Sequence, residues 1–136
     1  MKVKMIFFDM GGTIDLYPKD DSCVRNACSK MKQMLEEAGA DTLRKLTEEE
    51  FQQRVLNGIK NYTNFKTTEY IELPPEKLCS DFLFNGLNIN QNILNKLGED
   101  IAFIIDMEFY NRQPRPEARE VLEYLKHKNL RMGIIS

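Results

Sequence analysis

The chain has 136 residues, the length of one ordinary domain, of which 42% are hydrophobic and 29% are charged. This balance is typical of a folded globular protein and argues against a disordered chain. The formal net charge is −2, so the sequence lacks the general basic field that holds nucleic acids or anionic membranes. We therefore expect neither as a partner.

Two further features of the composition bear on localisation. No apolar stretch of the sequence is long enough to cross a bilayer. The three cysteines are an odd number without CxxC spacing, and we expect them as reduced thiols in a cytoplasmic protein.

The first predicted element is a strand. Val3 to Phe8 is a short apolar run that ends at Asp9 and the glycines Gly11 and Gly12. Such a run is typical of a strand buried on both faces in a parallel sheet. The simplest interpretation of Asp9 is a turn residue that caps a loose backbone amide.

The middle of the chain has the apolar periodicity of helices. Ser22 is the predicted N-cap of the first helix, and Gly39 is its predicted stop. The second helix is expected to begin at a capping box formed by Thr47 and Glu50. Pro75 suits the first turn of a third helix.

A longer helical pattern runs from about Asn90 to Tyr110, and Gly98 is a candidate break within it. Pro116 is expected to open a final helix, with Asn129 as its left-handed stop. Residues 130–136 then form a second apolar run, which predicts another buried strand.

This order predicts two parallel strands with a large helical insertion placed after the first. We assign residues 1–16 and 113–136 to an incomplete α/β core, and residues 17–112 to the insertion. Strands 3–8 and 130–135 are expected to be adjacent and parallel, with Asp9 and Ser136 side by side at their carboxyl ends.

Residues 9–13, DMGGT, have the form DxGGT, which resembles two kinds of phosphate-binding turn. One belongs to the sugar-kinase and actin-like ATPases, where glycines let backbone amides approach the nucleotide. The other is the first motif of the haloacid dehalogenase (HAD) superfamily, written DxDGT in most phosphatases. The kinase-like fold continues with an antiparallel strand near Leu16, whereas this chain continues with a long helical pattern after Lys19.

The other end of the chain favours the HAD interpretation. Residues 115–136, RPEAREVLEYLKHKNLRMGIIS, resemble the second HAD signature, in which a proline-led helix precedes a strand that ends on a serine, here Ser136. The helical block resembles the cap that many HAD enzymes insert after the first motif. The resemblance implies a partial Rossmann-like core of parallel strands with an inserted α-helical cap.

The resemblance also implies roles for individual residues. Asp9 would be the nucleophile that forms an aspartyl-phosphate, which water then hydrolyses. Gly11 and Gly12 would offer backbone amides to the phosphoryl oxygens, and Thr13 would hold the turn through its hydroxyl. Ser136 would donate a hydrogen bond to the phosphoryl group. Asp9 and the carbonyl of Gly11 would bind Mg²⁺.

The chain departs from the phosphatase pattern in two ways. Gly11 occupies the position of the second Asp, the general acid, and we expect the nearby Asp15 to be a solvated loop residue and not its substitute. The Lys or Arg and the acidic pair that follow the serine in the family have no counterpart up to Ser136. The basic residues at the last helix and strand are expected to form a solvated cluster. These residues are Lys126, Lys128 and Arg131.

The resemblance implies the N-terminal part of a HAD-like hydrolase, most simply a Mg²⁺-dependent phosphatase for a small phosphorylated metabolite. The 136-residue chain alone is expected to be inactive, and to self-associate through an open edge of its first strand. Three alternatives stay open: a non-catalytic truncated or partner-binding remnant, a dehalogenase-type hydrolase, and the kinase-like turn. No pattern names the substrate.

Overall fold

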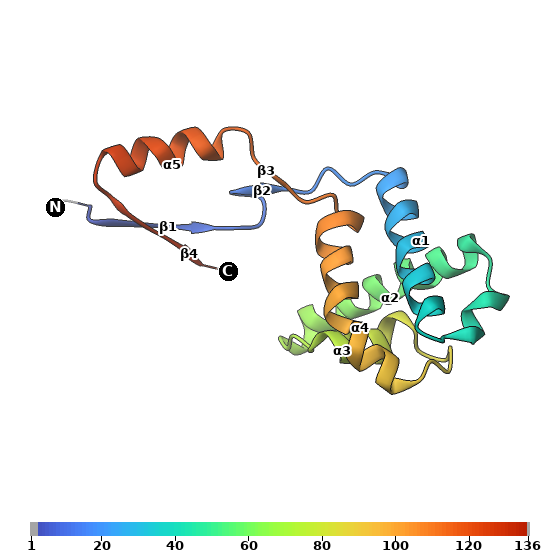
Figure 1. Ribbon diagram of the computed structural model, residues 1–136. Helices are drawn as coiled ribbons and strands as arrows, with labels where there is room; N and C mark the ends of the chain where they lie inside the picture. The colour runs from blue at the N-terminus through green and yellow to red at the C-terminus, as the bar shows by residue number, and fades with distance from the viewer. Residues whose placement is uncertain (1–2, 136) are drawn as a thin grey trace. The chain divides into compact units, whose positions relative to one another are not determined.

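The computed structural model describes residues 3–135 and has a mixed α/β fold (Figure 1). It divides into two compact units. One is built from both ends of the chain, up to Lys19 and from Asn111 onward, and the other runs from Asp20 to Tyr110. The helical insertion predicted from the sequence spans residues 17–112.

The α/β unit contains a two-stranded parallel sheet, a two-stranded antiparallel ribbon and one helix. Its elements are β1 (Met5–Asp9), β2 (Asp15–Leu16), β3 (Gln113–Pro114), α5 (Ala118–His127) and β4 (Arg131–Ile135).

The helical unit contains four α-helices, one 3-10 helix and two π-helical segments. These are α1 (Asp21–Glu37), the 3-10 helix η1 (Asp41–Lys45), α2 (Glu48–Glu69), α3 (Pro75–Leu78), the π-helical η2 (Cys79–Leu83), α4 (Gln91–Ile104) and the π-helical η3 (Ile105–Phe109).

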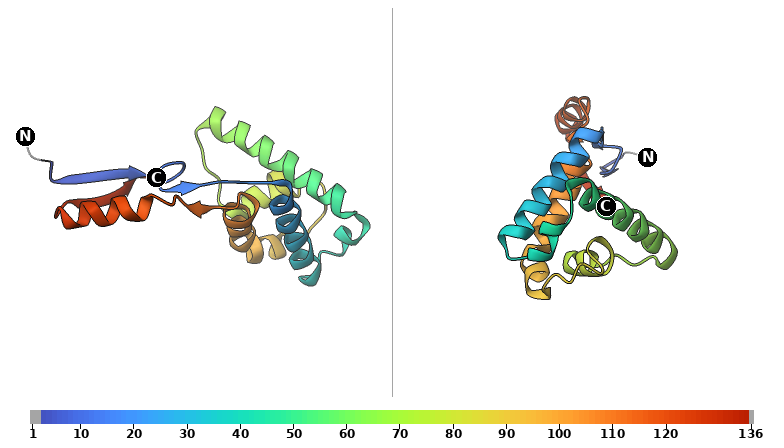
Figure 2. Two further views of the ribbon diagram at one scale, coloured as in Figure 1. Left: turned by 90° about the horizontal axis from the view of Figure 1, so that it is seen from above. Right: turned by 90° about the vertical axis from the view of Figure 1, so that its right-hand side faces the viewer.

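The two ends of the chain pair as the sequence predicts. β1 and β4 are parallel neighbours, in a register that runs from Met5 opposite Arg131 to Asp9 opposite Ile135. α5 connects to β4 through Asn129, whose φ of 57° confirms the left-handed stop, and it runs alongside both strands (Figure 2). Ser136 lies outside the described residues, so its expected position beside Asp9 stays a prediction.

The expectation that both strands are buried is wrong. Phe7 is 54% exposed, and Ile134 and Ile135 are 54% and 61% exposed. A parallel strand is buried on both faces only when elements cover both faces of its sheet. Here the parallel sheet has, among the described residues, two strands and one covering helix, and no described residue of the α/β unit belongs to the buried hydrophobic core.

The short strands β2 and β3 form a ribbon that the sequence did not predict. Asp15 lies opposite Pro114 and Leu16 opposite Gln113, in an antiparallel register. The kinase-like alternative needs an antiparallel hairpin within residues 3–25. The strand that follows β1 pairs instead with β3, almost a hundred residues later in the chain.

The first helix begins two residues earlier than expected. Its N-cap is Asp20, not Ser22, because the Asp20 carboxylate accepts a hydrogen bond from the backbone N–H of Cys23 at 2.8 Å and another from the Ser22 hydroxyl. These bonds lower the pKa of Asp20 to about 2. After the helix, Gly39 has a φ of 100° and stops it as predicted.

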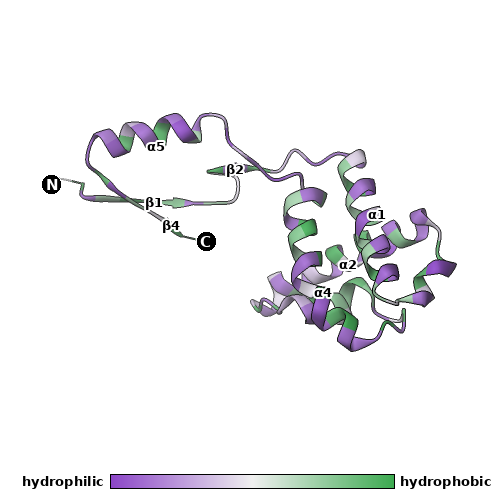
Figure 3. Cartoon of the chain, in the orientation of Figure 1, coloured by the Kyte–Doolittle hydropathy of each residue, from purple (hydrophilic) through white to green (hydrophobic). Residues whose placement is uncertain are grey.

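The hydrophobic core lies entirely within the helical unit, where the apolar faces of its helices meet (Figure 3). Its fully buried members include Met31 and Leu35 of α1, Phe51 of α2 and Ile101 of α4. Cys28 and Cys79 also belong to this core, and burial raises the pKa of each thiol to about 12. All three cysteines are free thiols.

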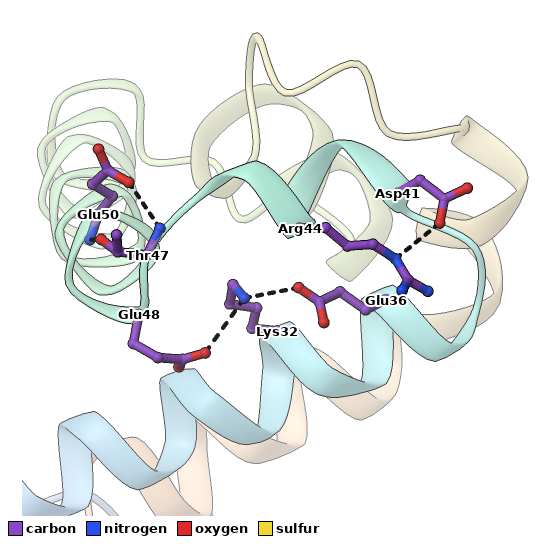
Figure 4. A network of polar contacts seen from close by, with 7 residues as sticks. All are labelled: Lys32, Glu36, Asp41, Arg44, Thr47, Glu48 and Glu50. Atoms are coloured by element: carbon purple, nitrogen blue, oxygen red, sulfur yellow. Dashed lines mark hydrogen bonds and ion pairs between the residues drawn. The ribbon is translucent and has the colours of Figure 1, made fainter.

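A polar network joins α1 to α2 on the side of this core (Figure 4). The Lys32 ammonium, with its side chain only 10% exposed, lies 2.8 Å from Glu36 and 3.4 Å from Glu48. Two carboxylates around one nearly buried cation offset its lost hydration, and they raise the pKa of Lys32, with the Glu36 hydrogen bond as the main cause.

Gly98 does not break the fourth helix, contrary to one expectation. α4 continues through it, and its lack of a side chain lets α3 approach closely. A Cβ at position 98 would lie 2.9 Å from the backbone nitrogen of Glu76. The glycine is therefore a contact point between two helices.

We predict that Gly98→Ala lowers the free energy of unfolding of the helical unit. Overpacking against the backbone of α3 costs about 1–3 kcal/mol, which outweighs the gain of up to about 1 kcal/mol from helix propensity. Urea unfolding followed by circular dichroism measures the difference. Lys96→Ala, at an exposed position of the same helix, is the control and should leave stability unchanged or slightly raised. A stabilised Gly98→Ala variant would contradict the close contact.

A second prediction concerns the start of α2, where the predicted capping box is confirmed. The Thr47 N–H donates to the Glu50 carboxylate at 2.8 Å, and the Glu50 N–H donates to the Thr47 hydroxyl at 3.1 Å. Thr47→Ala should cost about 1 kcal/mol of stability, and Thr47→Ser should restore most of it.

The Glu50 half of the box should depend on pH. Hydrogen bonds from Thr47 lower the pKa of Glu50, so its contribution is present above the ordinary glutamate pKa and is lost as pH falls through the lowered value. The stability difference between the natural chain and Glu50→Ala should therefore shrink on acidification. A difference that grows at low pH would contradict this assignment.

Candidate functional site

Asp9 is the last residue of β1, and its side chain is exposed. Because β1 and β4 are parallel, the carboxyl ends of both strands lie at the same edge of the sheet. Ile135 is directly opposite Asp9, and Ser136 follows it in the chain. Backbone pairing thus presents the Asp9 carboxylate at a strand end, the position at which open α/β sheets bind ligands.

The residues after Asp9 fold into a compact turn held by backbone hydrogen bonds. The Met10 carbonyl accepts from the N–H groups of Thr13, Ile14 and Asp15, at 3.3, 3.0 and 3.1 Å. Gly12 has a φ of 77°, a conformation that favours glycine. Thr13 therefore takes part in the turn through its backbone N–H, whereas the HAD resemblance implies this role for its hydroxyl.

The two glycines of the turn differ in their surroundings. A Cβ at Gly11 would lie 3.3 Å from the Tyr17 hydroxyl oxygen, so a side chain there would crowd the ring. The Gly12 N–H donates to the Asp15 carbonyl at 2.9 Å. This amide is occupied within the turn, and to serve a phosphoryl oxygen as expected it would have to share or exchange that bond.

The segment that returns from the helical unit binds the turn through Arg115. Its Nη2 donates to the Gly12 carbonyl at 2.6 Å, and its Nε donates to the Thr13 carbonyl at 3.0 Å. The Arg115 backbone N–H donates to the Ile14 carbonyl at 2.7 Å. Sequence reasoning missed this residue, and the only signal was the pair of arginines in the loop RQPRP.

Arg112, the other arginine of this loop, pairs with Asp15. Its Nε lies 2.6 Å from the Asp15 carboxylate, and the two side chains are 20% and 13% exposed. The guanidinium also lies over the Tyr17 ring, 5.8 Å from its centroid. The expectation that Asp15 is a solvated loop acid is therefore wrong, because this ion pair removes its carboxylate from solvent.

The described residues offer few ligands for a metal. Within residues 3–135, no group of three or more His, Cys, Asp or Glu side chains converges on one point. Asp9 and the Gly11 carbonyl remain the candidate oxygen ligands. They suit a Mg²⁺ ion that takes its other ligands from water and substrate phosphate, since Mg²⁺ is usually held by one or two carboxylates.

The helical unit has a separate open hollow of about 580 Å³ between α2 and η2. It is lined by Arg54, Asn57, Gly58, Asn61, Asp81, Phe82, Leu83 and Asn85. The polar side chains among these are all exposed. This hollow contains no residue of the turn.

The described part of the chain includes no helix with the length and apolar character needed to cross a membrane.

Comparison with known proteins gives no family for the chain, so a function can be argued only from the site. Neither the family models, nor the curated proteins, nor the solved structures that were compared with the chain gave a match.

Proposed function

We propose that the chain carries the nucleophile and phosphate turn of a HAD-type phosphatase acting on a small phosphorylated metabolite. The observation that supports this most is the placement of Asp9, an exposed carboxylate at the carboxyl end of a parallel strand, directly before a tight glycine turn. Asp9 is thereby fixed through its backbone while its carboxylate stays accessible to a substrate.

In this proposal the Asp9 carboxylate attacks the phosphorus of a phosphomonoester in line with the leaving oxygen. The phosphorus–oxygen ester bond breaks, the leaving alkoxide takes a proton from water, and an aspartyl-phosphate remains. A second water then attacks the phosphorus, which releases inorganic phosphate and restores the carboxylate. Mg²⁺, held by Asp9 and the Gly11 carbonyl, would supply positive charge against the repulsion between the anions.

Glycine at position 11 of the turn predicts which phosphate donors react with Asp9. Gly11 stands where phosphatases of the family carry their general acid, and Asp15 is paired with Arg112. Lost general-acid help costs roughly 10²–10⁴-fold, and the cost falls on leaving groups that need a proton. Activated donors such as acyl phosphates should therefore phosphorylate Asp9 far faster than alkyl phosphates.

The test is covalent trapping on the 136-residue chain. The chain is incubated with acetyl phosphate and Mg²⁺, quenched, and its peptides are examined by mass spectrometry. The chain alone is expected to lack turnover, but a single phosphoryl transfer from an activated donor does not need a general acid. We therefore expect one phosphoryl group on the peptide that contains Asp9, and none in Asp9→Asn. Glu120→Gln removes an exposed carboxylate of α5 in the same unit and should react like the natural chain. An adduct that survives in Asp9→Asn, or a folded natural chain with no adduct, would contradict the proposal.

The alternative of a partner-binding remnant is favoured by a different observation. Among the described residues, β1 and β4 each have one strand neighbour, and Val3, Phe7, Ile134 and Ile135 are all more than half exposed. Unpaired strand edges with apolar side chains recruit other chains. In this proposal, a second copy of the chain would pair along the open edge of β1.

We therefore predict that the chain self-associates in proportion to its concentration, and that Phe7→Lys makes it monomeric because a charge cannot be buried in such an interface. Sedimentation velocity over a range of concentrations measures this. Tyr70→Lys is the matched control, since Tyr70 is 91% exposed and lies in the helical unit. Self-association that is unchanged by Phe7→Lys but lost in Tyr70→Lys would place the interface elsewhere.

A further inference from the structure

We propose that Arg115 is the positioning residue of this site: it holds the turn after Asp9 in the shape that receives the phosphate. The inference rests on the proposed function and goes beyond it, because neither the motif nor the HAD resemblance assigns a role to this arginine. Arg115 reaches the turn from more than a hundred residues further along the chain.

The contact is made at two points. The guanidinium donates through Nη2 to the Gly12 carbonyl at 2.6 Å and through Nε to the Thr13 carbonyl at 3.0 Å. A guanidinium is a planar, rigid fork of donors, so its two bonds fix the directions of both carbonyls at once. Two consecutive peptide planes of the turn are therefore held by one side chain.

The same peptide planes explain how this contact shapes the turn. In a trans peptide, the C=O of one residue and the N–H of the next point in opposite directions. Carbonyls of Gly12 and Thr13 that face Arg115 therefore turn the N–H groups of Thr13 and Ile14 to the other side. Both of these N–H groups donate to the Met10 carbonyl, next to Asp9. Arg115 and the Met10 carbonyl thus hold the planes from opposite sides.

Arg115 also places a permanent positive charge on the turn. A positive charge near the turn would attract an anion whether the side chain makes one hydrogen bond to the turn or two. Lysine keeps the charge but provides a single flexible point, so Arg115→Lys separates the two contributions.

The attachment of the returning loop to the turn should survive the loss of this side chain, although the orientation of the Gly12 and Thr13 carbonyls should not. The backbone bond from Arg115 to the Ile14 carbonyl and the Arg112–Asp15 ion pair do not involve its guanidinium. The Arg115 side chain also lines an apolar hollow of about 170 Å³ together with Ile14, Ala118 and Val121. Methionine retains much of the aliphatic contact there, which makes Arg115→Met the least disruptive neutral variant.

The experiment titrates the 136-residue chain with inorganic phosphate in the presence of Mg²⁺ and follows the backbone amide signals of residues 9–13 by NMR. We expect Arg115→Met to bind phosphate at least tenfold more weakly, and Arg115→Lys to resemble it. In both variants the Thr13 and Ile14 amides should exchange with solvent faster while the unfolding midpoint of the helical unit stays unchanged. Arg119→Met is the matched control, because Arg119 is exposed on α5 and pairs with Glu123 on the same helix.

Full phosphate affinity in Arg115→Met would overturn the inference, and full affinity in Arg115→Lys would reduce the role to charge alone and overturn the positioning argument. If the natural chain shows no phosphate-dependent shift, the proposed phosphate site itself fails. Amide exchange of Thr13 and Ile14 then decides separately whether Arg115 shapes the turn, and unchanged exchange would overturn that part as well.

Discussion

The parallel pairing of β1 with β4 is the constraint on which the rest of this structure depends. Two parallel strands cannot be joined by a tight turn, so the chain between them must leave the sheet and return. Here that connection contains the whole helical unit as well as α5. The same pairing brings Asp9, near the start of the chain, opposite Ile135, near its end.

This arrangement divides the sources of stability between the two units. All the buried apolar residues belong to the helical unit, where capping, the Lys32 network and close helix contacts add to a continuous core. The described α/β unit has no buried apolar residue and is held by strand pairing and by the two arginines of the returning loop. Hydrophobic burial is the main favourable term in folding, so the α/β unit should be the less stable part.

Because the described α/β unit lacks buried apolar residues, the polar contacts around the turn contribute a larger share of its stability than such contacts do in a well-packed domain. Arg112 and Arg115 join the returning loop to residues 12–15 by directed hydrogen bonds, which fix orientation as well as proximity. In the proposed site, orientation is what counts, because an attacking carboxylate must approach phosphorus in line. The same unit also exposes apolar residues on its strands, and a second chain could bind to this surface.

Local signals in the sequence predicted local structure well. The capping box at Thr47, the proline at the first turn of α3, the left-handed Asn129 and both main strands depend on neighbouring residues, and all are confirmed. The parallel pairing was also predictable, from two apolar runs separated by helices.

Most of the errors concern properties that depend on residues far apart in the chain, whereas the N-cap at Asp20 in place of Ser22 is a local one. Strand burial depends on how many elements cover the sheet, which an apolar run does not reveal. Gly98 was taken for a break because its contact with α3 leaves no local pattern. Asp15 was expected in solvent because its partner, Arg112, is 97 residues away. The role of Arg115 was missed for the same reason.

The most direct test of the account is to locate a phosphoryl mimic on the chain. Beryllium fluoride with Mg²⁺ forms a stable mimic of an aspartyl-phosphate, and backbone amide shifts in NMR report where it binds. The account predicts shifts concentrated at Asp9 to Thr13 and at the end of β4, and their loss in Asp9→Asn. Shifts confined to the helical unit, such as the hollow between α2 and η2, would contradict a phosphate site at the end of β1.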